Sequence, residues 1–365
     1  MAAIVLTAAT PLLDLLDDVP GPRVLPVAVN ARVLATGEGG VRRVAAELLR
    51  ALDHLLPERG YAPLPRLSPA GGTPQLWEQA ALPLAARGRL ILGLGNQGPV
   101  LARNAITMIH DAQVFISPAS YSAGFRRWYM ASLPLIGRRH RRILTVSRFA
   151  AAELARHGVA STGRITVVPN GVDHILRPAP DRSIFDRLGV APGSYACALA
   201  NSQAHKNVGL LLRAFARPEL AHLHLVLTGA ARAEAFAAPV PANVIFAGAV
   251  SDAELRALLG AALCQLCPST TEGFGLPPLE AMRLGTPAII APLGALPETC
   301  GTAAIRAPAD DPAAWAAAIL RLAADPDEAR ARGAAGRDHA RAFTWHRAAE
   351  AVLAILEAEC PDPAR

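Results

Sequence analysis

The sequence predicts an α/β protein with two domains, each built on a parallel sheet that helices cover. Its 365 residues exceed one ordinary hydrophobic core and suit two domains of roughly 150–200 residues. Short apolar runs alternate with helical patterns along the chain, which is typical of parallel sheets with crossover helices. With 52% hydrophobic and 18% charged residues, the composition excludes a disordered chain.

The first half of the chain supplies five short apolar runs that predict strands. They are Val24–Val29, Leu90–Leu92, Ala105–Ile109, Ile143–Val146 and Ile165–Val168. Helical patterns predict helices at Gly39–His54 and Arg148–His157. Ser147 is a suitable N-cap for the second helix and Gly158 a suitable end, because serine accepts hydrogen bonds from free N–H groups and glycine tolerates left-handed backbone.

The second half repeats this alternation of strands and helices. Its predicted strands are Tyr195–Ala200, Leu223–Leu227, Val244–Phe246, Ala262–Leu266 and Ala288–Ile290. Its predicted helices are Val208–Ala216, Asp252–Leu259, Pro277–Leu284 and Pro312–Ala324. Prolines punctuate a polar stretch at Asp173–Pro192, so we expect the domain boundary there.

These elements divide the chain into residues 1–175, 176–340 and 341–365. The first range is expected to form a basic N-terminal domain and the second a C-terminal domain. A long helix, Thr344–Glu359, begins after the second domain is complete. We expect this last segment to return to the N-terminal domain.

Positive charge is concentrated in the first domain. Residues 1–175 have a net charge of +8 and residues 176–365 a net charge of −2. Six arginines cluster near Trp128 and Tyr129: Arg126, Arg127, Arg138, Arg139, Arg141 and Arg142. Two interpretations stay open, a solvated helix pair or a patch for anionic membrane, whose lipids attract each basic residue by about 1 kcal/mol. Nucleic acid is not expected, because no nucleic-acid-binding motif accompanies the cluster.

The cysteines and the apolar segments predict a cytoplasmic protein, attached peripherally to the inner face of the membrane if the arginine cluster binds lipid. Five scattered cysteines fit buried thiols in a reducing compartment. The apolar segment Met1–Ala9 lacks the basic residues of a secretory signal. No apolar run approaches the ~20 residues that span a bilayer, and no His or Cys spacing predicts a metal site.

The strongest motif is the string Glu-Gly-Phe-Gly-Leu-Pro-Pro-Leu-Glu at residues 272–280. It follows a predicted strand, and a proline at the first helical position opens a short helix. Four backbone N–H groups are thereby gathered at a helix N-terminus, which suits a phosphate. They belong to Gly273, Phe274, Gly275 and Leu276. Glu272 and Glu280 flank the turn, and carboxylates accept hydrogen bonds from the vicinal hydroxyls of a sugar or a ribose.

This string resembles the Glu-x7-Glu motif of the retaining family 4 glycosyltransferases, which have the GT-B architecture. Shorter matches follow along most of the chain: Asn30 with Gly39–Val41, His110–Asp111, Val146–Phe149, Val168–Asp173, Asn201–Asn207, Phe246–Asp252, Leu296–Glu298 and Phe343–Trp345. The resemblance implies two Rossmann-like domains whose parallel sheets face each other across a cleft, with the acceptor on the side of residues 1–175 and the nucleotide-sugar donor on the side of residues 176–340.

The resemblance also implies roles for single residues. Lys206 would neutralise the diphosphate leaving group, whose charge grows as the glycosidic bond breaks. Glu272 would bind hydroxyls of the donor sugar, and His110 would polarise a hydroxyl from the first domain. A larger set would hold the donor, with Glu280 at the ribose: Gly39, Gly40, Asn201, Lys206, Val250, Gly273, Phe274, Gly275, Leu276 and Glu280.

The implied activity is transfer of a hexosyl group, with retention of configuration, from GDP-mannose or a UDP-hexose. The acceptor would be a glycan or a lipid-linked sugar in polysaccharide or glycoconjugate synthesis. The nucleotide sugar is a co-substrate, and the resemblance implies neither a cofactor nor a metal. Many relatives place an arginine shortly before the lysine, where this chain has Asn201 and Ser202, so Arg148 is the candidate for the second cation.

Two alternatives stay open. Residues 93–98 read Gly-Leu-Gly-Asn-Gln-Gly, which matches the dinucleotide fingerprint of an NAD-dependent oxidoreductase. Only six residues separate Gly98 from the next predicted strand, whereas a crossover needs roughly ten or more, so we expect a loop there. The other alternative is a nucleotide-sugar-binding protein without catalysis.

Overall fold

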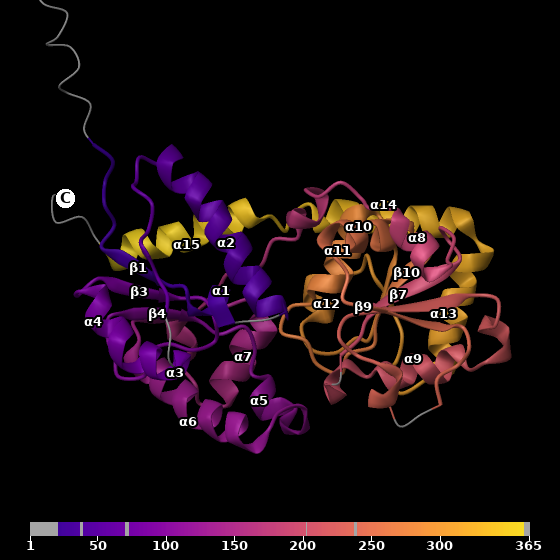
Figure 1. The fold of residues 1–365 in the computed structure, drawn as a ribbon, viewed down its shortest axis with the longest axis horizontal. Coiled ribbons are helices and arrows are strands. Elements are labelled where there is room, and N and C mark those ends of the chain that lie inside the picture. Colours follow the sequence, from indigo (N-terminus) through magenta and orange to yellow (C-terminus); the bar gives the residue numbers. More distant parts are fainter. Residues whose placement is uncertain (1–20, 37–38, 70–72, 202, 237–238, 361–365) are drawn as a thin grey trace, which may run out of the picture.

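The computed structural model describes residues 21–36, 39–69, 73–201, 203–236 and 239–360. Within these ranges the chain forms two lobes with one sheet each, and the C-terminal helices run along both lobes (Figure 1). The predictions for Met1–Ala9 and Ser202 lie outside the described residues.

The first lobe is built on a six-stranded parallel sheet in the order β2-β1-β3-β4-β5-β6. Its strands are β1 (Val27–Asn30), β2 (Arg66–Leu67), β3 (Leu90–Gly93), β4 (Ala105–Met108), β5 (Arg142–Thr145) and β6 (Ile165–Val167). The residues of β1, β3 and β4 are all buried, as expected for a parallel sheet that helices cover on both faces. The sequence analysis missed β2, because this two-residue edge strand contains no apolar run.

The second lobe is built on another six-stranded parallel sheet, in the order β12-β11-β10-β7-β8-β9. Its strands are β7 (Tyr195–Leu199), β8 (His224–Thr228), β9 (Val244–Gly248), β10 (Cys264–Cys267), β11 (Ala288–Ile290) and β12 (Ile305–Arg306). The predicted fold class, two parallel α/β sheets, is confirmed.

Helices cover both sheets. The first seven along the chain are α1 (Arg32–Thr36), α2 (Gly39–Glu58), α3 (Pro74–Leu76), α4 (Leu82–Ala86), α5 (Gln113–Ile116), α6 (Ala123–Arg139) and α7 (Arg148–Arg156). Those that follow are α8 (Ser183–Leu188), α9 (Val208–Phe215), α10 (Asp252–Ala261), α11 (Leu276–Leu284), α12 (Leu296–Thr299), α13 (Pro312–Ala324), α14 (Pro326–Ala340) and α15 (Trp345–Glu359).

Local sequence signals explain where several helices begin. Ser147 accepts a hydrogen bond from the N–H of Ala150 at the start of α7, as predicted.

The sequence analysis missed α14, because its buried face consists of Gly333, Gly336 and Ala340 rather than large apolar residues. This face packs closely on α11, where a Cβ on Gly333 would lie 2.1 Å from the carbonyl oxygen of Gly285.

Within the described residues the chain crosses between the lobes twice, and the two crossings contact each other. The N–H of Val172, in the first crossing, donates to the carbonyl of Phe343 in the second. A Cβ on Gly171 would lie 2.2 Å from the backbone nitrogen of Trp345, so only glycine fits there. After the second crossing, α15 packs against α2 in the first lobe (Figure 1).

The loop at residues 93–98 contains no helix N-terminus. The described chain passes from β3 through this loop to β4 without an intervening helix, so the geometry of a dinucleotide fingerprint is missing there. Its glycines instead allow close packing, since a Cβ on Gly95 would lie 2.8 Å from Val33 and one on Gly98 2.9 Å from Thr107. This finding removes the structural basis for the NAD-dependent alternative.

No helix among the described residues combines the length and the apolar character needed to cross a bilayer.

Candidate functional site

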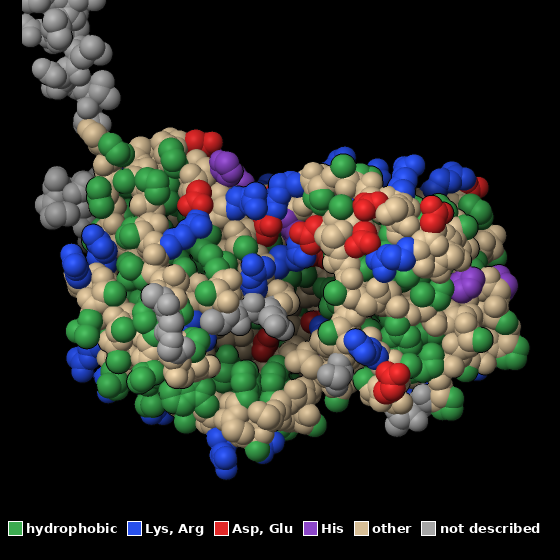
Figure 2. Space-filling model, viewed as in Figure 1, with side chains coloured by type: hydrophobic (Ala, Val, Ile, Leu, Met, Phe, Trp, Pro, Cys, Tyr) green, Lys and Arg blue, Asp and Glu red, His purple; other side chains and the backbone are tan. Residues whose placement is uncertain are grey.

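A cavity of about 1890 Å³ lies between the two lobes. Figure 2 shows the hollow between them, with basic side chains gathered along the upper edge of the junction. The loops that follow β4, β7 and β10 contribute to its walls, and ligands of open α/β sheets bind at such carboxyl ends of strands. Most of the predicted site residues line it: Gly39, Gly40, His110, Asn201, Lys206, Glu272, Gly273, Phe274, Gly275, Leu276 and Glu280.

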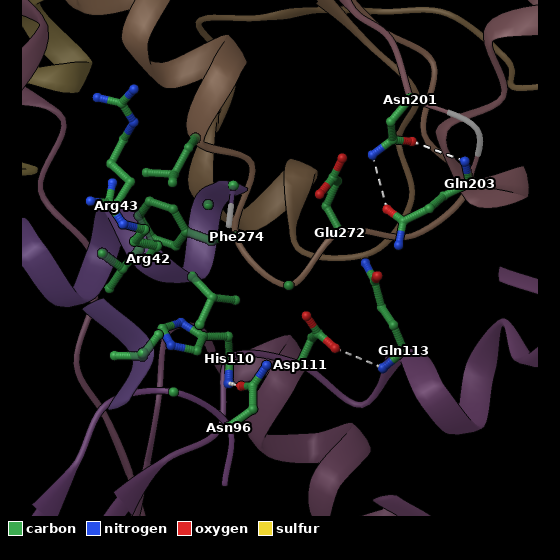
Figure 3. Close-up of a pocket in the computed structure, with 18 of the residues that line it drawn as sticks. Arg42, Arg43, Asn96, His110, Asp111, Gln113, Asn201, Gln203, Glu272 and Phe274 are labelled. Carbon is green, nitrogen blue, oxygen red and sulfur yellow. Dashed lines mark hydrogen bonds between the residues drawn. The ribbon is translucent and has the colours of Figure 1, made fainter. Parts of the chain in front are cut away.

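An ion pair between Lys206 and Glu272 occupies the wall formed by the second lobe. Lys206 lies at the end of a short 3₁₀ turn after β7, and Glu272 lies in the loop between β10 and α11. Their Nζ and Oε1 atoms are 2.6 Å apart. The hydroxyl of Ser269 donates to the same carboxylate oxygen at 2.7 Å. In Figure 3, Glu272 lies across the cavity from Asp111 and Gln113 of the first lobe.

Both partners of this pair are charged. Burial opposes ionisation of Glu272, but the attraction of Lys206 and hydrogen bonds from Lys206 and Ser269 outweigh it, so the pKa of Glu272 lies below its ordinary value. Burial likewise opposes the charge on Lys206, yet the attraction of Glu272 raises the pKa of its ammonium group. The cavity therefore contains a buried cation and anion that a charged ligand can separate.

The loop before α11 presents free backbone donors to the cavity. Gly275 adopts a left-handed conformation with φ of 93° and caps α11, whose first turn contains proline. The hydroxyls of Ser147 and Thr299 hold the loop by donating to the carbonyls of Gly273 and Phe274 at 2.6 and 2.7 Å. Within the described chain, the N–H groups of residues 273–275 donate no hydrogen bond to protein. Three free donors at a helix N-terminus suit an anion.

His110 approaches this loop from the first lobe. Its Nε2 lies 2.9 Å from the carbonyl of Leu94; because a carbonyl only accepts, the proton is on Nε2 and Nδ1 is an acceptor. Burial lowers the pKa of the imidazole, which favours its neutral form. The backbone carbonyl of His110 would lie 2.6 Å from a Cβ on Gly273, so the two lobes meet here only because residue 273 is glycine.

Glu280 lies one turn inside α11 and also lines the cavity. Its Oε1 is 3.0 Å from Nε2 of His174, which follows the first crossing between the lobes. The two glutamates of the string are therefore held differently, one by a lysine and the other by a histidine.

Two family models match the chain, one for each lobe. The model for glycosyltransferase family 4 matches residues 85–176, and the model for glycosyl transferases group 1 matches residues 194–325. The MMP alpha-(1->4)-mannosyltransferase of Mycolicibacterium hassiacum is 31% identical over 285 residues, which cover 73% of this chain and 67% of that protein. The chain belongs to the family 4 glycosyltransferases.

Another relative is matched over a shorter region. The D-inositol 3-phosphate glycosyltransferase of Segniliparus rotundus is 31% identical over 233 residues, 60% of this chain and 52% of that protein. The matched region thus spans about half the length of this relative.

Solved structures share the GT-B fold at low sequence identity. Sucrose-phosphate synthase from Thermosynechococcus elongatus has a TM-score of 0.70 and 19% identity, with 91% of this chain and 98% of that chain covered. Anabaena Alr3699/HepE in complex with UDP-glucose also has a TM-score of 0.70, at 16% identity, with 91% and 99% covered. These similarities show that this family 4 member has the GT-B fold.

Two predicted site residues lie away from the cavity wall. Arg148 is not among the described residues that line the cavity; its guanidinium is exposed and lies 3.4 Å from Glu298, which also accepts from the N–H groups of residues 148 and 149. Val250 packs against an apolar cluster of the second lobe instead. In this structure Glu298 holds both the Arg148 guanidinium and the start of α7.

Three arginines that the sequence analysis did not select do line the cavity: Arg32, Arg42 and Arg43. Arg43 bridges the lobes through a 2.5 Å contact with Asp252, and this hydrogen bond, which outweighs the opposing effect of burial, raises the pKa of Arg43. Arg42 lies two residues after Gly40, and the sequence analysis had already selected that glycine turn for the site. Its place beside the turn is the sequence signal that could have identified it.

In the described part of the chain, no group of three or more His, Cys, Asp and Glu side chains suits a metal ion.

The predicted arginine cluster divides into two parts. Arg141 and Arg142 contact Glu359 of α15, with 3.1 Å between the Arg142 Nε and the carboxylate. Arg138 and Arg139, at the end of α6, are exposed. Arg141 and Arg142 therefore hold the C-terminal helix, and in the described structure the members of the cluster without an ion pair are the α6 arginines Arg126, Arg127, Arg138 and Arg139.

Proposed function

We propose that this family 4 member is a retaining glycosyltransferase that moves a hexosyl group from a nucleotide-diphosphate sugar to an acceptor hydroxyl. The observation that carries the proposal is the Lys206–Glu272 pair beside three unbonded N–H groups at the start of α11. A diphosphate needs a cation and N–H donors, and a sugar needs a carboxylate that accepts from its hydroxyls. The cavity wall offers all of these together.

Donor binding would exchange the partners of the pair. The distal phosphate would take the N–H groups of residues 273–275, and the Lys206 ammonium would turn from Glu272 to a phosphate oxygen. Glu272 would then accept hydrogen bonds from hydroxyls of the sugar. This exchange keeps both buried charges paired, which matters because an unpaired buried charge is costly.

The proposed reaction is a same-face displacement. The bond between the sugar carbon and the phosphate oxygen breaks, and the acceptor oxygen bonds to that carbon on the same face. The acceptor proton passes to an oxygen of the departing phosphate, so no protein base is needed. His110, with Nδ1 free to accept, would orient a sugar hydroxyl, and Lys206 would stabilise the growing phosphate charge. The chain's own cations would supply this charge without a metal or cofactor.

The donor is proposed to be GDP-mannose or a UDP-hexose. One family 4 relative is named as a mannosyltransferase, and one structure with the same fold is a complex with UDP-glucose. The acceptor is proposed to be a glycan or lipid-linked sugar that enters over the first lobe, for polysaccharide or glycoconjugate synthesis. There the cavity wall is aromatic and contains Tyr121, Phe125, Trp128 and Tyr129, and such side chains favour ligands with apolar faces.

Peripheral attachment to an anionic membrane at its cytoplasmic face is proposed for the same lobe. The arginines of α6 are accompanied by exposed apolar side chains, Phe125, Trp128, Met130 and Leu135. Basic and apolar residues on one helix are typical of surfaces that lie on lipid.

A transfer assay tests the proposed function. Purified protein is incubated with GDP-mannose, UDP-glucose or UDP-galactose and lipid-linked sugar acceptors, and release of nucleoside diphosphate is measured beside a Glu272→Gln control. Release that depends on the acceptor and on Glu272 is expected. Nucleotide binding without turnover would favour the non-catalytic alternative, and no binding of any nucleoside diphosphate would overturn the proposal.

A further inference from the structure

A chain of three buried side chains ends at Glu280. The indole Nε1 of Trp345 lies 3.1 Å from Nδ1 of His174, and Nε2 of His174 lies 3.0 Å from Oε1 of Glu280. Their exposed fractions are 2%, 3% and 5%. Neither contact was expected from the sequence, which gave a role in the site to Glu280 and placed Trp345 only in the short match Phe343–Trp345.

The donors and acceptors in this chain have one consistent arrangement. An indole N–H only donates, so Nδ1 of His174 must accept from Trp345. A neutral imidazole then carries its proton on Nε2, which donates to Glu280. Trp345 thus selects the tautomer that His174 needs in order to hold the carboxylate.

This contact leaves the ligand-facing part of Glu280 available. Within the described residues, Glu280 accepts no other hydrogen bond, and the residue lines the cavity. The nearby cation Arg43 is already paired with Asp252. Oε2 of Glu280 is therefore open to a donor from a ligand, while Oε1 fixes the plane of the carboxylate.

His174 and Trp345 come from the two crossings between the lobes. His174 lies in the 3₁₀ helix η4 (Asp173–Leu176), directly after the first crossing, and Trp345 begins α15, directly after the second. The backbone N–H of Trp345 also donates to Asp173 at 2.8 Å. The orientation of Glu280 is therefore tied to the segments that set the relative position of the lobes.

We propose that His174 and Trp345 are positioning residues that orient Glu280 toward the two ribose hydroxyls of the nucleotide. This inference rests on the proposed function, because it requires that the cavity binds a nucleoside diphosphate. Trp345 acts through His174, and His174 acts through Glu280.

The experiment compares the affinity of GDP or UDP, whichever binds, with that of its 2′,3′-dideoxy form by calorimetry. If Glu280 accepts from the ribose, the wild-type protein prefers the ribose form by roughly 10- to 100-fold, the effect of hydrogen bonds to a charged acceptor. The dideoxy nucleotide has no ribose hydroxyls for Glu280 to bind, so its affinity depends only on the other contacts in the site. This affinity should be the same in every variant. The ratio of the two affinities therefore isolates the action of Glu280.

Paired substitutions of His174 separate its two nitrogens. In His174→Gln the side-chain amide can still donate near the Nε2 position, so the ratio should stay within about threefold of wild type. In His174→Asn the shorter amide can still accept from Trp345 but cannot reach Glu280, so most of the preference should be lost. Trp345→Phe removes only the indole N–H and should lower the ratio several-fold. His222→Asn, at an exposed histidine of the second lobe, is the matched control.

The outcomes distinguish this inference from the proposed function. If wild-type protein prefers the ribose form and His174→Asn leaves that preference unchanged, the positioning role is overturned while the proposed function stands. If both affinities fall together with the melting temperature, His174 has only a structural role, and the inference is equally wrong. If the wild-type protein binds no nucleoside diphosphate, both proposals fail.

Discussion

Lys206 Nζ lies 2.6 Å from Glu272 Oε1, so the lysine after β7 is paired with the first glutamate of the Glu-x7-Glu string. Of the 36 basic residues in the sequence, 35 are arginine and this one is lysine. A compact ammonium group on a flexible stem can turn from a carboxylate to a phosphate, whereas the broad, planar guanidinium group has a different shape and hydration. The pair therefore explains why lysine is suited to this position.

Substitution of Lys206 should abolish transfer while the fold persists. Lys206→Ala should lower kcat by about 100- to 1000-fold, the effect of losing one preorganised contact to a developing anion. Lys206→Arg should also lose most turnover, because the planar guanidinium group does not fit the position that the ammonium group of lysine occupies. Steady-state kinetics with circular dichroism as the fold control measure this, and near-native turnover of Lys206→Arg would contradict the argument from shape.

The two glutamates should have separable effects on nucleotide binding. Glu272→Gln should damage transfer without lowering the affinity for free nucleoside diphosphate, because that ligand has no sugar and Lys206 is released to the phosphates. Glu280→Gln should weaken the free nucleotide by roughly 10- to 100-fold, since it loses hydrogen bonds to a charged acceptor. Calorimetry on both variants checks this, and equal losses of nucleotide affinity would exclude the division of roles.

Gly273→Ala should separate the lobes at their contact. The new Cβ would lie 2.6 Å from the carbonyl oxygen of His110 and 2.9 Å from Cβ of Asp111, so backbone must move. We expect a loss of donor affinity and a change in the distance between the lobes, which small-angle scattering can detect. Gly163→Ala, where a Cβ meets nothing within 4 Å, is the control; equal behaviour of the two variants would argue against a contact role for Gly273.

Acid should destabilise the protein partly through His140. Burial lowers the pKa of this histidine from 6.5 to about 4. Between these values the unfolded chain binds a proton that the folded chain does not, so stability falls as pH drops below 6.5 and is unaffected above it. In His140→Gln the amide can still donate to the carbonyl of Pro99 but cannot titrate. Between pH 6.5 and pH 4 the free energy of unfolding of this variant should therefore fall by up to about 3 kcal/mol less than that of the wild type. Urea unfolding at several pH values measures it, and parallel pH curves for the two proteins would refute this contribution.

Membrane binding should depend on the free arginines of α6. Reversing Arg126, Arg127, Arg138 and Arg139 to glutamate should reduce binding to anionic vesicles at least about 100-fold, since each basic residue contributes about 1 kcal/mol near such a surface. Salt at 1 M should have a similar effect, because the Debye length shrinks to about 3 Å. Vesicle sedimentation measures both effects.

Two matched reversals control the membrane experiment. Arg330→Glu with Arg332→Glu, on α14 of the second lobe, should leave vesicle binding unchanged. Arg141 and Arg142 are unsuitable as test positions, because their contacts with Glu359 hold α15 and their reversal would lower the melting temperature. Binding that ignores both salt and the α6 charges would rule out electrostatic docking.

Much of the fold could be predicted because its signals are local. The strand at Tyr195–Ala200 is observed as β7, and the helix at Asp252–Leu259 as the start of α10, where Ser251 and Glu254 form a capping box. The helix α14 was missed because glycines form its buried face. Apolar periodicity identifies a helix only where large apolar side chains are buried.

The sequence by itself determined the fold class, the family and the glycine-containing loop that opens α11. Each depends on residues that are neighbours in the chain: alternating apolar runs, a glycine turn and a proline-started helix. Such patterns act through backbone conformation and local hydrogen bonds, so they can be recognised in the sequence before any long-range contact is known.

Only the tertiary structure decided which side chains meet. Lys206 and Glu272 are 66 residues apart, His174 and Glu280 are 106 apart, and Trp345 and His174 are 171 apart. Arg148, which the sequence favoured as a cation for the ligand, instead pairs with Glu298. These partners depend on how two sheets face each other and on where the chain crosses between them. Packing of the whole chain sets that geometry, and no short stretch of sequence encodes it.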